Sequence, residues 1–185
     1  GGLSGNCTIA GSVTLTGSIS GTVTVASGGT LVIDGNVVHE QHGTLTNAGT
    51  VVWKAGSIYG YKDSGVASAI VNQAGAVFEV QGDTSMVVAN FADALSFTNA
   101  GTFRRTTSTG QATISCPFTS TGTVAVQTGT LYFSGGVTNA GTVGVSAGAT
   151  VNLNGASVQG GSAASVAGTV TLTGNVSGTV NGTGL

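Results

Sequence analysis

The phrase Thr-Asn-Ala-Gly-Thr occurs three times in this chain, as TNAGT at residues 46–50, 98–102 and 138–142. Each copy follows a large apolar residue and precedes a short strand-like run, as in LTNAGTVVW. Exact and approximate copies repeat a glycine at intervals of 19 to 27 residues: Gly49, Gly75, Gly101, Gly122, Gly141 and Gly168. Apolar alternation with period two after these glycines predicts short strands. A repeat of this length predicts one coil of a parallel β-solenoid.

The composition also favours strands and turns. The chain has 33 glycines, one proline, 40% hydrophobic residues and only 5% charged residues. Disorder requires low hydrophobicity and high net charge, and the glycines lack the every-third-residue spacing of collagen. No segment has apolar residues at helical spacing over the length of a helix. We therefore expect an ordered all-β protein with almost no helix, and no membrane insertion because no apolar run approaches about 18 residues.

The predicted architecture is a single-stranded parallel β-solenoid, or β-helix, of about seven or eight coils. Residues 11–185 are expected to form this single repeat domain, and residues 1–10 an N-terminal arm. Short strands between turns would also suit a β-sandwich. The recurrence of one asparagine-glycine corner favours the solenoid, in which neighbouring coils pair at about 4.8 Å.

The residue types of the repeated phrase suit a tight corner. Glycine permits a positive φ, and asparagine tolerates similar conformations while it bonds to nearby backbone. The asparagines of successive coils could also stack as an amide ladder, in which a serine, Ser120, takes one place. The predicted ladder consists of Asn47, Asn72, Asn99 and Asn139. A row of asparagines that binds a glycan is the functional alternative.

A family resemblance is carried by FTNAGTFRRTTSTGQATISCPFTSTGTVAVQTGTLYFSGG at residues 97–136 and by TNAGTVVWKAGSIYG at residues 46–60. These segments resemble the degenerate repeats of large bacterial secreted and surface β-helix proteins. Autotransporter passengers and filamentous-haemagglutinin-like adhesins belong to this class. The resemblance extends from about Gly21 onwards. It implies a right-handed parallel β-helix with an extracellular structural or adhesive role, and it transfers no catalytic residue.

Two groups of residues are candidates for chemistry. A zinc-protease helix needs histidines at i and i+4, whereas His39 and His42 flank Glu40 at i and i+3 and would point to opposite faces of a strand. We expect a solvated loop there, and neither a metal nor a cofactor. No spacing pairs the carboxylates as glycoside cleavage requires, so an enzyme is not predicted. The acidic residues are Asp34, Glu40, Asp63, Glu79, Asp83 and Asp93.

Cys7 and Cys116 are the two thiols. A disulfide is permitted in an exported protein. At a separation of about four coils, however, the two residues exceed the Cα distance of about 4.4–6.8 Å that a bridge spans. An intramolecular disulfide would need the N-terminal residues to run back along the solenoid. An intermolecular disulfide and a pair of free buried thiols are the two alternatives.

The ends of the chain lack charge. All ten charged residues, four basic and six acidic, lie between Asp34 and Arg105, although solenoid ends are normally protected by charge, proline or a cap. The segment GSVTLTGSISGTVTV at residues 11–25 also resembles GTVTLTGNVSGTVNG at residues 168–182. The apolar positions of the two ends are therefore the predicted assembly surfaces: Val13, Leu15, Val23, Val170, Leu172 and Val180.

These features predict a non-enzymatic structural protein that associates head to tail into a bacterial extracellular filament or surface fibre. The polar but uncharged composition and a start without Met suggest an exported, mature chain at the cell surface or outside the cell. The few cations argue against nucleic acid as a partner. An adhesin stalk or a module that binds surface glycans is the alternative. Ice binding is a third possibility, and it requires Thr-X-Thr at one place on successive coils.

Overall fold

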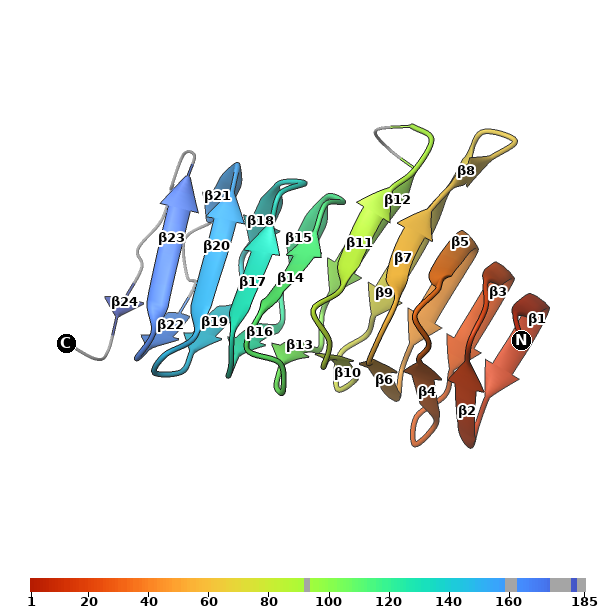
Figure 1. Ribbon diagram of the computed structural model, residues 1–185, viewed down its shortest axis with the longest axis horizontal. Coiled ribbons are helices and arrows are strands. Elements are labelled where there is room, and N and C mark those ends of the chain that lie inside the picture. Colours follow the sequence, from red (N-terminus) through yellow and green to blue (C-terminus); the bar gives the residue numbers. More distant parts are fainter. Residues whose placement is uncertain (92–93, 159–162, 174–180, 183–185) are drawn as a thin grey trace.

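The protein forms a parallel β-solenoid of about eight turns in the computed structural model (Figure 1), which describes residues 1–91, 94–158, 163–173 and 181–182. This part of the chain consists of strands, turns and loops, and it has no helix. The strands pair in parallel in every case except a small hairpin between β8 (Lys62–Asp63) and β9 (Val66–Asn72). The predicted all-β solenoid is thus confirmed, and the β-sandwich is excluded.

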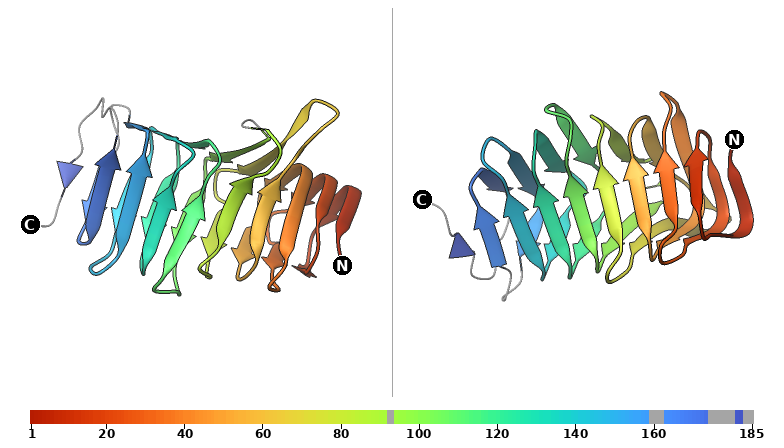
Figure 2. Two further views of the ribbon diagram at one scale, coloured as in Figure 1. Left: turned by 45° about the horizontal axis from the view of Figure 1, so that its top comes forward. Right: turned by 90° about the horizontal axis from the view of Figure 1, so that it is seen from below.

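A full coil contributes one strand to each of three faces (Figure 2). Face 1 holds the strands that precede the asparagine corner: β1 (Leu3–Ile9), β3 (Ile19–Val25), the second half of β5 (Val38–Asn47), β9, β12 (Leu95–Asn99), β15 (Phe118–Ser120), β18 (Val137–Asn139) and β21 (Ala156–Val158). Face 2 holds the strands that follow the corner: β2 (Ser12–Leu15), β4 (Thr30–Ile33), β6 (Thr50–Trp53), β10 (Val77–Val80), β13 (Thr102–Arg105), β16 (Thr123–Val126), β19 (Thr142–Val145), β22 (Ala163–Val166) and β24 (Asn181–Gly182). Face 3 completes the coil: the first half of β5, β7 (Ser57–Gly60), β11 (Ser85–Val88), β14 (Gln111–Ile114), β17 (Thr130–Phe133), β20 (Thr150–Asn154) and β23 (Thr169–Thr173).

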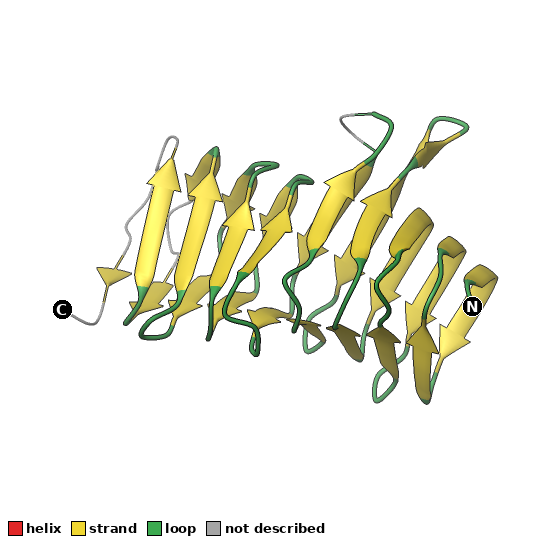
Figure 3. Ribbon diagram, viewed as in Figure 1, coloured by secondary structure: helices red, strands yellow, loops and turns green. Residues whose placement is uncertain are grey.

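Strand β5 connects two of the faces. Its residues 38–41 pair with β7, and its residues 44–47 pair with β9. Faces 1 and 3 therefore belong to one sheet of 15 strands, whereas face 2 is a separate sheet of nine strands. The loops gather along the edges between faces (Figure 3), so the flat surfaces of the molecule are formed by strands.

The first ten residues do not form a separate arm. Residues Leu3–Ile9 are strand β1, which pairs in parallel with β3 over its whole length. The amino terminus itself donates a hydrogen bond to the hydroxyl of Thr16, 2.7 Å away. The repeat domain therefore begins at the first strand, and the boundary predicted at residue 11 is too late.

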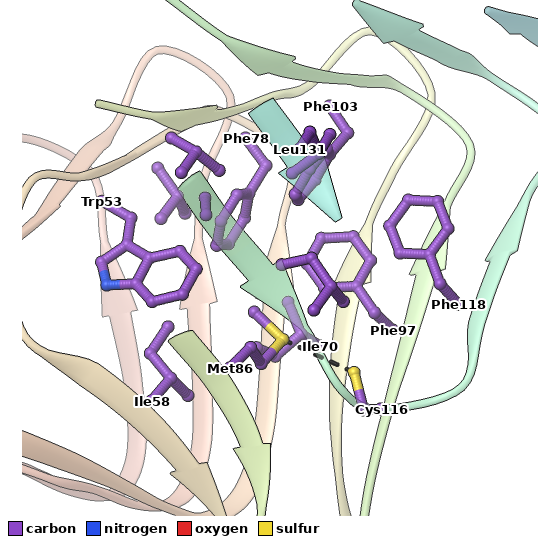
Figure 4. Close-up of a cluster of buried hydrophobic side chains, with 14 of the residues drawn as sticks. Trp53, Ile58, Ile70, Phe78, Met86, Phe97, Phe103, Cys116, Phe118 and Leu131 are labelled. Atoms are coloured by element: carbon purple, nitrogen blue, oxygen red, sulfur yellow. Dashed lines mark hydrogen bonds between the residues drawn. The ribbon is translucent and has the colours of Figure 1, made fainter. Parts of the chain in front are cut away.

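The core is built from inward-facing side chains that stack from coil to coil. On face 1, Phe97 lies in register with Ile70 on one side and Phe118 on the other, and the rings of Phe97 and Phe118 stack at 5.1 Å. On face 2, Phe78 and Phe103 stack at 5.5 Å. The two aromatic stacks meet edge to face inside the solenoid (Figure 4). Along each strand, these inward apolar residues alternate with outward residues that are more exposed. The same period-two pattern predicted the strands from the sequence.

Candidate functional site

The predicted asparagine ladder exists inside the corner between faces 1 and 2. The amide nitrogen of Asn47 donates to Oδ1 of Asn72 at 2.8 Å, and that of Asn72 donates to Oδ1 of Asn99 at 2.8 Å. The ladder continues from Asn99 to the hydroxyl of Ser120 at 3.1 Å. Asn139 follows Ser120 in register. Each amide also bonds to backbone, so the ladder satisfies polar groups that the corner buries.

This ladder cannot present itself to a glycan. Asn47, Asn72 and Asn99 are 0% exposed, and Ser120 and Asn139 are 1% exposed. Their amide groups point into the solenoid, where they bond to one another and to strand carbonyls such as that of Val77. The interpretation of the asparagine row as a glycan-binding surface is therefore wrong, because a ligand cannot reach it.

The corner glycines have a different role from the predicted one. Gly49, Gly101, Gly122 and Gly141 do not have a positive φ. Instead, a Cβ at Gly122 would overlap the carbonyl oxygen of Gly101 in the neighbouring coil, and one at Gly141 would overlap that of Gly122. The same carbonyls accept hydrogen bonds from the next coil, as from Thr123 to Gly101 at 2.8 Å. Glycine is required here because backbone packs on backbone.

Two of the six predicted corner glycines belong elsewhere. The pairing of β6 with β10 puts Ala76, not Gly75, in the place of Gly49. Gly75 lies in a longer version of the turn and has a φ of +82°. It is the one predicted corner glycine that has the positive φ expected from the sequence. Gly168 precedes β23 and occupies the place of Ala149, so it lies at the corner between faces 2 and 3.

The threonines of the repeated phrase form two outward ladders, one on each side of the asparagine corner. The ladder on face 1 is Thr8, Thr24, Thr46, Val71, Thr98, Thr119, Thr138 and Ser157. The ladder on face 2 is Ser12, Thr30, Thr50, Val77, Thr102, Thr123 and Thr142. In the described part of the chain, none of these threonine hydroxyls has a hydrogen-bond partner. Each ladder is interrupted only by valine, which has the same shape as threonine.

The histidine cluster lies in strand β5, not in a loop. His39 is 2% exposed and points inward, with Nδ1 2.9 Å from the carbonyl oxygen of Gly17. His42 points outward, with Nδ1 2.6 Å from Oδ2 of Asp63 and its ring stacked on Tyr61. The two histidines therefore face opposite ways, as predicted. Among the described residues, no group of three or more His, Cys, Asp or Glu side chains could hold a metal ion.

Glu79 is held in an ion pair on face 2. Its carboxylate accepts hydrogen bonds from Arg104 on the next strand, from Gln81 at 2.6 Å and from Thr106 at 3.0 Å. Burial alone would raise the pKa of Glu79. The hydrogen bonds from these three residues and the charge of Arg104 outweigh that effect, so the pKa lies below its ordinary value of 4.5. This carboxylate is therefore ionised and structural.

The second ion pair joins Asp83 to a fully buried arginine. Arg105 occupies an inward position of face 2, in register with Val80 and Val126. Its guanidinium donates to Oδ1 of Asp83 at 2.5 Å and to the backbone carbonyl of Gly82 at 2.7 Å, among others. A hydrogen bond from Ser108 and the pairing with Arg105 lower the pKa of Asp83. Arg105 thus ties together the turns on either side of it. Asp93 lies outside the described residues.

The two thiols are separate and free. Cys116 is buried and contacts the sulfur of Met86 at 3.6 Å (Figure 4). Burial raises the pKa of the Cys116 thiol to about 12. Cys7 is half-buried in β1 at the N-terminal end. The structure therefore excludes an intramolecular disulfide between Cys7 and Cys116, and only Cys116 is fully buried.

The predicted assembly positions divide between the ends and the interior. Val13 is partly buried on β2, and Leu15 on the same strand is fully buried. Val23 lies one coil further in, between Cys7 and Leu45, and is covered on both sides. At the other end, Val170 and Leu172 on β23 are partly buried against the core, and Val180 lies outside the described residues.

The two similar segments near the ends occupy different faces. Residues 12–15 form β2, which pairs with β4 on face 2. Residues 169–173 form β23, which pairs with β20 on face 3. The sequence likeness between residues 11–25 and 168–182 therefore does not mean that the segments hold the same place in a coil.

A shallow depression of about 380 Å³ lies on the outside of face 3, over β17, β20 and β23. Its lining is Tyr132, Asn152, Asn154, Thr171 and Thr173. Tyr132, Asn152 and Thr171 form one column of the face, and Asn154 and Thr173 form another. Sequence reasoning missed this group because the five residues come from three coils with unrelated local sequences. Only the pairing register of β17, β20 and β23 shows that these five residues lie side by side.

Comparisons with known protein families, curated proteins and solved structures found no match. Within the described residues, no helix is long and apolar enough to cross a membrane.

Proposed function

We propose that this chain is a non-enzymatic structural element of a bacterial extracellular filament or surface fibre, and that it assembles by end-to-end stacking of solenoid coils. The observation that carries the proposal is the uncharged strand edge of the first described coil. Strand β1 pairs only with β3, and β2 only with β4, among the described residues. An open strand edge without charge is a template for another strand, and residues 1–33 contain no charged side chain.

The interior of the first coil is also incompletely covered. Leu3, Cys7 and Val13 pack against the core but are only partly buried. One coil further in, the inward residues Val23 and Leu31 are 0% exposed. A coil stacked on β1 and β2 would bury the first group in the same way, and burial of apolar surface favours association.

The proposed contact continues the solenoid face by face. A second copy would add its last coil to β1 on face 1 and to β2 on face 2. The first coil has no strand on face 3, because that face begins with β5. Stacking would therefore use two of the three faces. Since the contact joins two different surfaces, repeated association generates an open filament.

The test is the assembly state of the purified chain as its concentration is raised. Light scattering and negative-stain microscopy should show fibres of the width of one solenoid. Val13→Lys places a charge at the N-terminal end and should abolish the fibres, because a coil stacked there would bury that charge. The single chain should still fold, because lysine can keep its stem on the core and its charge in water. Thr119→Lys adds the same charge in the middle of face 1 and should leave them intact. A monodisperse wild-type monomer, or equal effects of both variants, would contradict the proposal.

A second candidate function, ice binding, is favoured by the two threonine ladders. Their hydroxyl and methyl groups repeat at the coil spacing of about 4.8 Å, a repeat comparable with that of oxygen atoms in hexagonal ice. Thr-X-Thr is in register on adjacent coils at Thr22, Thr24, Thr44 and Thr46. Thermal hysteresis in wild-type protein that is lost with Thr46→Tyr would support this function. Absence of hysteresis in the wild type would rule it out.

A further inference from the structure

We propose that the depression on face 3 binds a neutral carbohydrate, with Tyr132 as its stacking platform. This inference goes beyond the assembly proposed above and does not depend on it. The depression has a volume of about 380 Å³ and lies on strands β17, β20 and β23. That volume is at the small end of the range of about 300–1,000 Å³ for ligand pockets.

The lining combines the side-chain types that suit a sugar. A tyrosine ring offers an apolar face to the C–H groups of a sugar ring, and its hydroxyl offers a polar edge. The amides of Asn152 and Asn154 can each donate and accept, as can the hydroxyls of Thr171 and Thr173. Sugar hydroxyls also do both, so mixed donors and acceptors match them better than charged groups would.

Several of these polar groups have no protein partner. In the described part of the chain, Tyr132, Asn152 and Thr171 make no side-chain hydrogen bond. The hydroxyl of Thr173 donates to Oδ1 of Asn154 at 2.8 Å, which fixes the orientation of that amide and leaves its nitrogen as a donor. The depression thus holds one oriented amide and three free polar groups around an aromatic ring.

The absence of charge selects the class of carbohydrate. None of the five lining residues is charged, and every charged residue of the chain lies between Asp34 and Arg105. Recognition of a uronate, sulfate or phosphate group would call for arginine or lysine. By contrast, a depression of similar volume near β7 has the acidic residue Asp83 in its lining. The face 3 site therefore suits a neutral sugar.

The register indicates how a glycan chain would lie. Tyr132, Asn152 and Thr171 follow one another along the solenoid axis, at the coil spacing of about 4.8 Å. That spacing is comparable with the length of one hexose unit in an extended polysaccharide. A glycan aligned with the axis would meet one polar group per coil while one ring stacks on Tyr132.

Biolayer interferometry on immobilised polysaccharides tests this proposal. The probes are three neutral polymers, galactomannan, mixed-linkage glucan and xylan, and alginate as the acidic one. The wild-type protein should bind at least one neutral polymer and not alginate. Tyr132→Ala should weaken that binding by about tenfold or more, and Asn152→Ala by about fivefold. Tyr59→Ala is the matched control, because Tyr59 is a half-buried tyrosine of the same face outside the depression, and it should bind like the wild type.

Three results would overturn the assignment. They are no binding of the wild type to any neutral polymer, unchanged binding of both depression variants, and an equal loss in the Tyr59 control. Circular dichroism establishes that each variant is folded. If Tyr132→Ala does not fold, Asn152→Ala decides the question, because Asn152 is half-buried on the surface and makes no side-chain bond within the described structure.

Discussion

Replacing Asn72 with alanine removes a central member of the asparagine ladder. The side chain of Asn72 is 0% exposed and accepts a hydrogen bond from Asn47. It donates to Asn99 at 2.8 Å and to the carbonyl oxygen of Thr102 at 3.1 Å. Asn47 keeps its second bond, to a backbone carbonyl. The amide oxygen of Asn99, however, loses its partner inside the protein.

The expected cost follows from these contacts. Three lost hydrogen bonds contribute about 1 kcal/mol each, and a buried acceptor left without a partner costs about 1–3 kcal/mol. Because some of these losses overlap, we expect Asn72→Ala to lower the free energy of unfolding by roughly 3–5 kcal/mol. Ser120→Ala removes only one ladder bond and should cost about 1 kcal/mol. Thr98→Ala changes an exposed residue of the same repeated phrase and should cost less than about 0.5 kcal/mol.

Urea unfolding followed by tryptophan fluorescence measures these differences. Trp53 is the single tryptophan and is 0% exposed, so its emission reports the loss of the core around β6. The order of the three variants is the essential result. If Asn72→Ala is within about 1 kcal/mol of the wild type, or if Thr98→Ala is as costly, the ladder is not what stabilises the corner.

The remaining predictions concern glycines, acid and thiols. Gly148 has a φ of +76° and open space around it, and asparagine tolerates a positive φ, so Gly148→Asn should cost about 1 kcal/mol or less of stability. Gly122→Asn should cost roughly 3 kcal/mol or more, because its Cβ would meet the backbone of the neighbouring coil. Equal melting temperatures of the two variants would contradict this. Folding lowers the pKa of Glu79 below 4.5, so the ionised carboxylate stabilises the fold above that pH, and this effect is lost as the pH falls. The difference in melting temperature between wild type and Glu79→Gln should therefore shrink toward zero in acid. A difference that grows in acid would show that folding raises this pKa instead. In thiol titration at neutral pH, Cys7 should react in the native protein and Cys116 only after unfolding, since burial raises the pKa of Cys116 to about 12. The prediction is contradicted if both thiols react quickly in the native protein, or if both react only after unfolding.

Much of the fold could be predicted because the repeat reports on local structure. The phrase around Asn47 and its copies located the corner, and the alternation after each copy located the strands of face 2. The asparagine ladder could be predicted because the asparagine holds the same place in each copy of the repeated phrase. Such features depend on residues close in sequence, where period and turn chemistry are informative.

The parts that failed depend on register, which a degenerate repeat leaves open. Coils of 16 to 28 residues allow a glycine to be aligned with the wrong corner, as happened with Gly168. The reason for glycine at Gly122 was also invisible, because the atom it avoids belongs to Gly101 in another coil. The depression around Tyr132 unites three coils for the same reason. Contacts between coils therefore decide the surface, and sequence alone does not fix them.

The stacking of coils has a mechanical consequence. The backbone hydrogen bonds between coils point along the long axis, and strands β1 and β23 lie at opposite ends of the stack (Figure 1). A pulling force applied to the two ends would therefore load one coil boundary at a time and peel the chain away in steps. Each released coil of 16 to 28 residues would lengthen the molecule by roughly 50–100 Å. The asparagine ladder crosses three of these boundaries with two side-chain bonds each, so those steps should require the greatest force.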